Sequence, residues 1–76
     1  MQYELWGRKR SINGVGQQLK FVSSFTKESM FQTMIDSLDP KLYQEGIVLR
    51  RNKGKIDRIL TYKEYDRPYQ YVKIKH

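Results

Sequence analysis

Hydrophobic and polar positions alternate in two stretches near the start of the chain. Within residues 2–7, Tyr3 and Leu5 occupy one side of the alternation, which has the period of a β-strand with two usable faces. The alternation resumes over residues 17–25, where one side holds Leu19, Phe21, Ser23 and Phe25. Asn13-Gly14, between these stretches, readily adopts positive φ and indicates a tight turn. We therefore expect a β-hairpin.

A helical period follows the hairpin. Thr26 is the expected N-cap, and Glu28 lies in the first turn, near the positive end of the helix dipole. Asp39-Pro40 provides the stop, because the residue before a proline avoids the α region. The predicted helix makes about three turns. Its apolar stripe consists of Met30, Phe31, Met34, Ile35 and Leu38.

Three more strands are expected after the helix. Residues 47–49 form a short apolar strand, and residues 56–65 form a second one, with a basic turn between them. Asp66-Arg67-Pro68 breaks the chain, and the alternation of residues 69–75 predicts a final edge strand. The order along the chain is thus ββαβββ.

This order predicts an α+β fold. A right-handed crossover through the helix places the first strand between the second and the third, so every neighbouring pair is antiparallel. The expected sheet has four to five strands in the order 2-1-3-4-5, with one helix on one face and the other face open to water. A chain of 76 residues has room for one core, so residues 1–76 are expected to be a single domain.

The charge balance narrows the choice of partners. Fifteen Lys and Arg against eight Asp and Glu give a net charge of +7, which favours nucleic acid, an acidic protein surface or acidic lipid. The chain has no cysteine, which excludes disulfides and thiolate metal sites. No apolar run approaches the ~20 residues of a membrane span, and residues 1–10 do not form an apolar signal segment. We expect a cytoplasmic protein with no membrane partner.

Two clusters of cations coincide with the predicted turns. Clustered Arg and Lys neutralise phosphates and release counterions, which makes these tips candidates for nucleic-acid binding. The alternative is that charged tips stay solvated and discourage aggregation between sheet edges. The topology also places the two tips at opposite ends of the sheet. The candidate residues are Arg8, Lys9, Arg10, Arg50, Arg51, Lys53, Lys55 and Arg58.

Tyrosines alternate with cations in the last third of the chain. Tyr62, Tyr65, Tyr69 and Tyr71 are interleaved with Lys and Arg, like surfaces on which unpaired bases stack. Aromatic residues also stabilise antiparallel sheets and line protein interfaces, and this interpretation is favoured. Tyr62, Tyr69 and Tyr71 are the candidate partner-surface residues. Trp6 is expected to be half-buried in the sheet.

The sequence argues against catalysis. Its single histidine is His76, and the acidic residues are scattered and mostly flanked by Lys or Arg. Neither a Cys-His nor a Ser-His-Asp arrangement can be assembled without the chain end. The Gly14-Val15-Gly16 segment lacks the third glycine of a dinucleotide fingerprint. We expect no enzymatic activity, no cofactor and no metal.

One segment carries a resemblance. The run Phe21-Val-Ser-Ser-Phe-Thr-Lys-Glu-Ser-Met, continuing to Leu38-Asp-Pro-Lys-Leu-Tyr43, looks like the short accessory proteins of bacteriophages and mobile elements of Gram-positive bacteria. The resemblance implies a small non-enzymatic protein that acts in the host cytoplasm. Such proteins bind DNA, regulate, or block a host defence protein.

Three hypotheses follow from these patterns. The first is a nucleic-acid-binding accessory protein that uses the two basic tips on DNA or RNA. The alternative is a protein-binding inhibitor or regulator, for example of a host defence protein, that uses the open sheet face or the edge strand over residues 69–75. The third is a homo-oligomer that completes its sheet through that edge.

Overall fold

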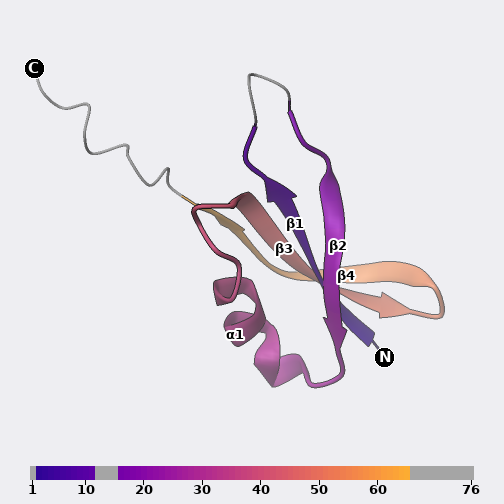
Figure 1. The fold of residues 1–76 in the computed structure, drawn as a ribbon. Helices are drawn as coiled ribbons and strands as arrows, with labels where there is room; N and C mark the ends of the chain where they lie inside the picture. Colours follow the sequence, from indigo (N-terminus) through magenta and orange to yellow (C-terminus); the bar gives the residue numbers. More distant parts are fainter. Residues whose placement is uncertain (1, 12–15, 66–76) are drawn as a thin grey trace, which may run out of the picture.

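The computed structural model describes residues 2–11 and 16–65, which form one antiparallel sheet with a short helix beside it (Figure 1). The strands are β1 (Gln2–Lys9), β2 (Leu19–Phe25), β3 (Tyr43–Asn52) and β4 (Lys55–Glu64). A 3₁₀ turn, η1 (Glu28–Met30), leads into the helix α1 (Phe31–Asp36). The strands lie in the order β2-β1-β3-β4. The crossover through α1 therefore places β3 next to β1.

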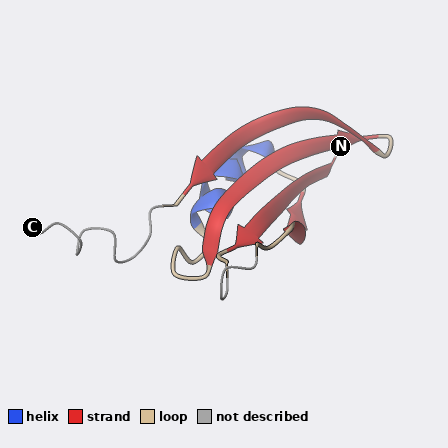
Figure 2. Ribbon diagram, turned by 90° about the horizontal axis from the view of Figure 1, so that it is seen from above, coloured by secondary structure: helices blue, strands red, loops and turns tan. Residues whose placement is uncertain are grey.

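The predicted α+β class, an antiparallel sheet with one helix on one face, is confirmed. The sheet is antiparallel, and the helix packs on one face of a strongly curved sheet (Figure 2). The first four strands have the predicted order. The expected fifth strand, over residues 69–75, lies outside the described residues.

The helix differs from the prediction at both ends. Thr26 is not its N-cap: Lys27 precedes η1 and Met30 precedes α1, and neither side chain caps the helix. Instead of about three α-turns, the chain makes a 3₁₀ turn and six α-helical residues. Ser37 ends α1 early, because its N–H and its hydroxyl both donate to the Met34 carbonyl, at 3.1 and 2.6 Å. A short helix covers only part of the sheet.

The strands are mostly longer than their apolar runs. β1 extends to Lys9, so Arg8 and Lys9 belong to a strand and not to a hairpin tip. β3 runs over ten residues instead of three, because its polar ends pair with β1 and β4: Arg8 lies opposite Glu45, and Gln2 opposite Arg51. Cross-strand pairing therefore extends strands beyond the positions that hydrophobicity marks.

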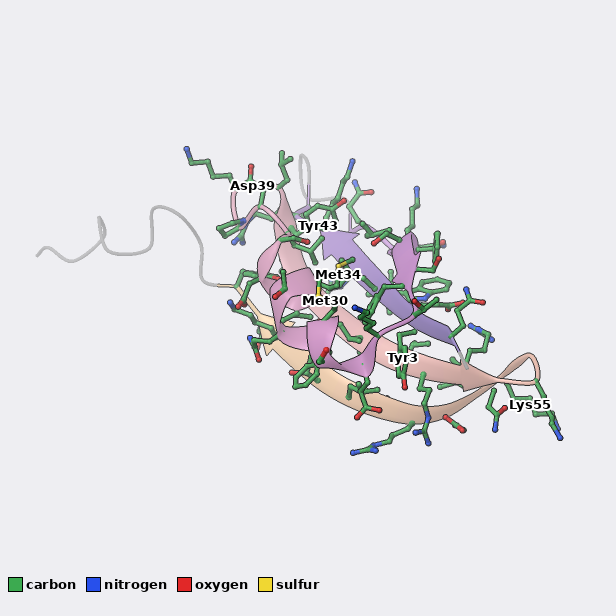
Figure 3. All side chains as sticks on the ribbon, turned by 90° about the horizontal axis from the view of Figure 1, so that it is seen from below. Tyr3, Met30, Met34, Asp39, Tyr43 and Lys55 are labelled. Atoms are coloured by element: carbon green, nitrogen blue, oxygen red, sulfur yellow. The ribbon has the colours of Figure 1, made fainter. Side chains whose placement is uncertain are left out.

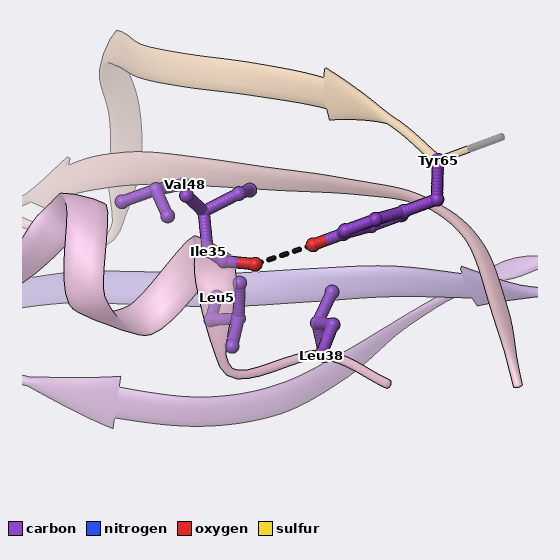
Figure 4. Packing of buried hydrophobic residues seen from close by; sticks show 5 residues of the cluster. All are labelled: Leu5, Ile35, Leu38, Val48 and Tyr65. Atoms are coloured by element: carbon purple, nitrogen blue, oxygen red, sulfur yellow. Dashed lines mark hydrogen bonds between the residues drawn. The ribbon is translucent and has the colours of Figure 1, made fainter. Parts of the chain in front are cut away.

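The core lies between α1 and the central strands. Its buried members are Leu5, Ile35, Leu38, Val48 and Tyr65 (Figure 4). The Tyr65 hydroxyl donates to the Ile35 carbonyl, which ties the residue that follows β4 to the helix. Tyr65 is thus a core residue, and its ring is not available for base stacking.

Two paired glycines in the sheet allow the side chains of Leu38 and Tyr43 to pack closely against the strand backbones. Gly7 of β1 lies opposite Gly46 of β3. A Cβ atom on Gly46 would lie 2.6 Å from Cδ1 of Leu38, and one on Gly7 would lie 2.8 Å from the Tyr43 ring. A Cβ at either position would force Leu38 or Tyr43 to shift, so the absence of a side chain at these two positions makes room for both residues.

A β-bulge changes the direction of half of β2. Leu5 lies opposite Ser23, but Trp6 lies opposite Phe21, so Val22 is an extra residue in β2. Phe25 consequently stacks on Tyr3 on the helix side, at 5.5 Å between ring centroids, while Phe21 is on the other face. The prediction that Leu19, Phe21, Ser23 and Phe25 share one face was wrong, because it assumed an uninterrupted period of two.

Candidate protein interface on the open face of the sheet

The face of the sheet opposite α1 receives side chains from all four strands. Its members follow from the register, because residues directly opposite in an antiparallel ladder point to the same face. Trp6 lies opposite Phe21 in β2 and Ile47 in β3. Ile47 in turn lies opposite Tyr62 in β4. We call this surface the open face; it comprises Gln2, Glu4, Trp6, Arg8, Leu19, Phe21, Ser24, Glu45, Ile47, Leu49, Arg51, Ile56, Ile59, Tyr62 and Glu64.

Exposed apolar side chains are concentrated on the open face. Of the eight large hydrophobic residues that are exposed in the described part of the chain, five belong to it. Single exposed apolar residues are common in proteins, but several on one face mark an interaction surface. Their exposed fractions are 41% for Leu19, 51% for Phe21, 53% for Ile56, 58% for Ile59 and 53% for Tyr62.

A tryptophan anchors the β1–β2 side of this surface. The Trp6 ring packs edge-on against Phe21, with 5.9 Å between ring centroids. The Trp6 Nε1–H donates to Oε1 of Glu4 at 2.9 Å, which satisfies the one polar group of the indole. As predicted, Trp6 is half-buried. Its ring is held in place, as an anchor at an interface would be.

An ion pair closes one end of the open face. Arg51 donates to both carboxylate oxygens of Glu4, at 3.0 and 3.1 Å. Glu4 is buried, with 7% of its surface exposed. The bonds from Arg51 hold the pKa of Glu4 below the usual range of a glutamate, although burial opposes this shift. The carboxylate is therefore charged and fully engaged.

A second charged cluster lies at the other end of β1. The Arg8 Nε–H donates to Oε2 of Glu45 at 2.5 Å, and the Tyr62 hydroxyl donates to Oε1 of Glu45. The bond from Arg8 lowers the pKa of Glu45, and the bond to Glu45 raises the pKa of Tyr62. Glu64, directly opposite Glu45, adds a second negative charge. Arg8 offsets the repulsion between the two glutamates.

Several of the predicted phosphate-binding cations are already engaged. Arg8 pairs with Glu45 and Arg51 with Glu4. Arg50 pairs with Asp57 at 2.8 Å. Arg10 donates to the backbone carbonyls of Pro40 and Tyr65, at 2.7 and 3.3 Å. A phosphate would have to compete with these internal acceptors.

The remaining candidates separate into two places. Lys53, Lys55 and Arg58 are exposed, and within the described ranges no carboxylate lies within 4.0 Å of their charged groups. Figure 3 shows Lys55 at the β3–β4 turn, far from Asp39 and Tyr43 at the other end of the sheet. Lys9 lies opposite Tyr43 at that other end. The two basic clusters therefore do not form one surface.

Of the three candidate tyrosines, one lies in the part of the chain that the structure describes. Tyr62 is exposed on the open face, whereas Tyr69 and Tyr71 lie outside the described residues. Phe21 and Ile59 also belong to this surface, and the hydrophobic pattern of the sequence did not indicate it. The bulge at Val22 places Phe21 on a different face from the one that simple alternation predicts. The register shift in the β3–β4 ladder between Val48 and Leu49 has the same effect on Ile59.

The described residues contain no cluster of metal-ligating side chains. No three His, Asp or Glu side chains in residues 2–11 and 16–65 come together as metal ligands would. A surface hollow beside β2 and η1 has one titratable side chain, Lys27, in its lining of Gln2, Ser24, Phe25, Thr26, Lys27 and Met30. In the same ranges, no helix is long and apolar enough to cross a membrane.

The chain matches no family model, no curated protein and no solved structure.

Proposed function

We propose that this chain is a non-enzymatic protein-binding module that acts through the open face. The observation that carries the proposal is the group of five exposed apolar side chains on one sheet face, beside a tryptophan held by Glu4 and Phe21. Interfaces are rich in aromatic residues and poor in free charge at their centre. The open face has this composition, with its ion pairs towards the two ends of β1.

The charge of the open face favours protein over nucleic acid there. The face holds two arginines against three glutamates, and both arginines bond to glutamates of the same face. A sheet that binds single-stranded nucleic acid combines stacking rings with free cations that follow the phosphates. Rings are present on the open face, but free cations are not.

The test compares lysine substitutions on and off the open face. Phe21→Lys and Ile59→Lys each place a charge within the proposed interface, on β2 and β4, and Leu42→Lys makes the same change at an exposed apolar position outside it. Partners retained by immobilised wild type and Leu42→Lys should be lost by both open-face variants. The resemblance to phage accessory proteins makes lysate of a Gram-positive host the first source of partners. Equal retention by all three variants contradicts the proposal.

A second candidate function is binding of nucleic acid through the β3–β4 turn. It is favoured by the three exposed cations there, Lys53, Lys55 and Arg58, which have no carboxylate partner among the described residues. Each phosphate that they neutralise should add about 0.7 to 0.9 to the slope of log affinity against log salt. This site is separate from the open face, so the two functions are independent.

Anisotropy of labelled duplex DNA, single-stranded DNA and RNA across a salt series tests this candidate. Changing the three turn cations together to Gln should weaken binding and reduce the slope by about 2 to 3. Changing Lys9, Lys20 and Lys27 together to Gln removes the same charge elsewhere and is the control. Equal losses in both triple variants would show that net charge alone binds the probe.

A further inference from the structure

We infer that the open face binds a second copy of this chain, so that two sheets pack face to face. This inference rests on the proposed function and names the partner. The two-fold arrangement places the same surface on both sides of the interface, so each apolar side chain contributes twice. Three observations support it: the apolar area, the charge balance of the open face, and the interruptions at both sheet edges.

The exposed apolar area fits a small dimer interface. A fully exposed aromatic side chain presents on the order of 200 Å², so Phe21 and Tyr62 each expose roughly 100 Å². With Leu19, Ile56 and Ile59 the total is on the order of 400 Å² per copy. Homodimer interfaces are about 65% apolar, so the whole interface would bury roughly 1,200 Å². This is the lower end of the range for specific complexes.

The charge distribution favours contact between two open faces. Outside the open face, the described residues hold ten Lys or Arg against four Asp or Glu, so the rest of the described chain is strongly positive and two copies repel each other through it. The open face holds two arginines against three glutamates and is nearly neutral. Two copies that approach through this face meet the least repulsion. Self-association of a basic protein requires that its contact surface be nearly neutral. Binding of an unrelated protein has no such requirement.

The sheet edges are less suited to self-association than the face. β2 has the extra residue Val22, and the β3–β4 ladder shifts register twice, between Val48 and Leu49 and between Arg50 and Arg51. Such irregularities interrupt the row of hydrogen-bonding groups that strand addition needs. β4 also carries Lys55, Arg58 and Lys63. The open face is the broad apolar surface that remains in the described part of the chain.

Sedimentation equilibrium of the purified full chain tests the inference over about 1 μM to about 1 mM. The mass should rise with concentration from 9.2 kDa towards twice that value. Phe21→Lys and Ile59→Lys should raise the dimer Kd by more than about tenfold, because each side chain is removed twice. Leu42→Lys, with the same charge change off the face, should leave the Kd within about threefold of wild type.

Salt and fluorescence supply independent readouts. Raising NaCl from about 50 mM to about 500 mM screens the repulsion between two chains of charge +7, so the dimer should tighten. Trp6 is the single tryptophan of the chain and lies on the open face, so its emission should move to shorter wavelength as dimer forms. A dimer that weakens with salt, or forms without changing Trp6 emission, would overturn the inference.

Failure of this inference is distinguishable from failure of the proposed function. A wild-type chain of 9.2 kDa at every concentration and salt overturns the second copy as partner. The proposed function then depends only on the capture experiment, in which Ile59→Lys and Leu42→Lys must differ. Dimers that Phe21→Lys and Ile59→Lys leave intact would place self-association on another surface and overturn the inference as well.

Discussion

At the residue scale, the buried Glu4 carboxylate is the position where charge and packing depend most on each other. Arg51 supplies two of its hydrogen bonds and Trp6 supplies a third. A carboxylate that is 7% exposed and loses its arginine remains in an environment that water cannot compensate. Arg51 therefore has a structural task that its place in a basic run does not reveal.

Arg51→Met should lower the free energy of unfolding by about 2 kcal/mol, because it leaves Glu4 with Trp6 as its remaining partner. Arg58→Met removes an exposed arginine of the same β3–β4 hairpin and should change this free energy by less than about 0.5 kcal/mol. Urea denaturation of both variants at neutral pH measures the difference. Equal effects would show that the Glu4–Arg51 pair has no special weight.

The sequence identified the arginines but not their partners. Glu45 is 37 residues from Arg8, and Glu4 is 47 residues from Arg51. Such pairs can be predicted only when the strand register is known, whereas the run of cations can be read directly from the sequence. The runs of basic residues in the sequence therefore led to an overestimate of the number of unpaired cations, because the carboxylates that pair with them lie on neighbouring strands.

At the element scale, the β3–β4 turn is held in an unusual backbone conformation. Lys53 has φ 54° and Gly54 has φ 82°, so both central residues of this two-residue loop are in the left-handed region. Such turns suit the right-handed twist of a hairpin and prefer Asn-Gly. A lysine at the first position is strained, and the glycine at the second is needed.

Lys53→Asn should raise the free energy of unfolding by about 0.5 kcal/mol, because asparagine tolerates positive φ better than lysine. Gly54→Ala should lower it by about 1 kcal/mol, although no atom lies within 4 Å of the added Cβ. Thermal unfolding followed by circular dichroism measures both changes. The same sign for both variants would contradict the role assigned to the turn geometry.

Alternation predicted the strands better than it predicted their faces. The order and antiparallel pairing of four strands followed from the hydrophobic runs and the crossover rule. The faces of Phe21 and Ile59 did not, since one inserted residue reverses every later side chain in a strand. Bulges cannot be recognised in a single sequence. The sequence therefore predicted that one face of the sheet is open, but not which residues form it.

At the scale of the whole molecule, carboxylates bonded to cations link stability to pH. The pKa values of Glu4, Asp36, Glu45 and Asp57 all lie below the usual carboxyl range, in each case mainly because of a hydrogen bond from an arginine or lysine. Groups whose pKa is lower in the folded state stabilise it above their unfolded pKa. Their contribution is lost as the pH falls through the lower, folded value.

The free energy of unfolding should therefore be nearly constant between about pH 6 and 7 and fall progressively below about pH 4.5. Urea denaturation at a series of pH values measures this dependence. Glu45→Gln should reduce the fall, because an amide does not titrate in this range. Unchanged stability down to about pH 3 would contradict the ion pairs as drawn.

The paired glycines of β1 and β3 also check the alignment of the sheet. Leu38 and Tyr43 occupy the space that side chains at Gly46 and Gly7 would fill, and these glycines lie opposite each other. A slip of two residues between the strands would keep every side chain on its face but would separate the glycines and bring a larger residue beneath the helix. The side chains between the helix and the sheet would then have to move. A misaligned sheet should therefore be less stable than the native one, although its hydrophobic pattern would still match.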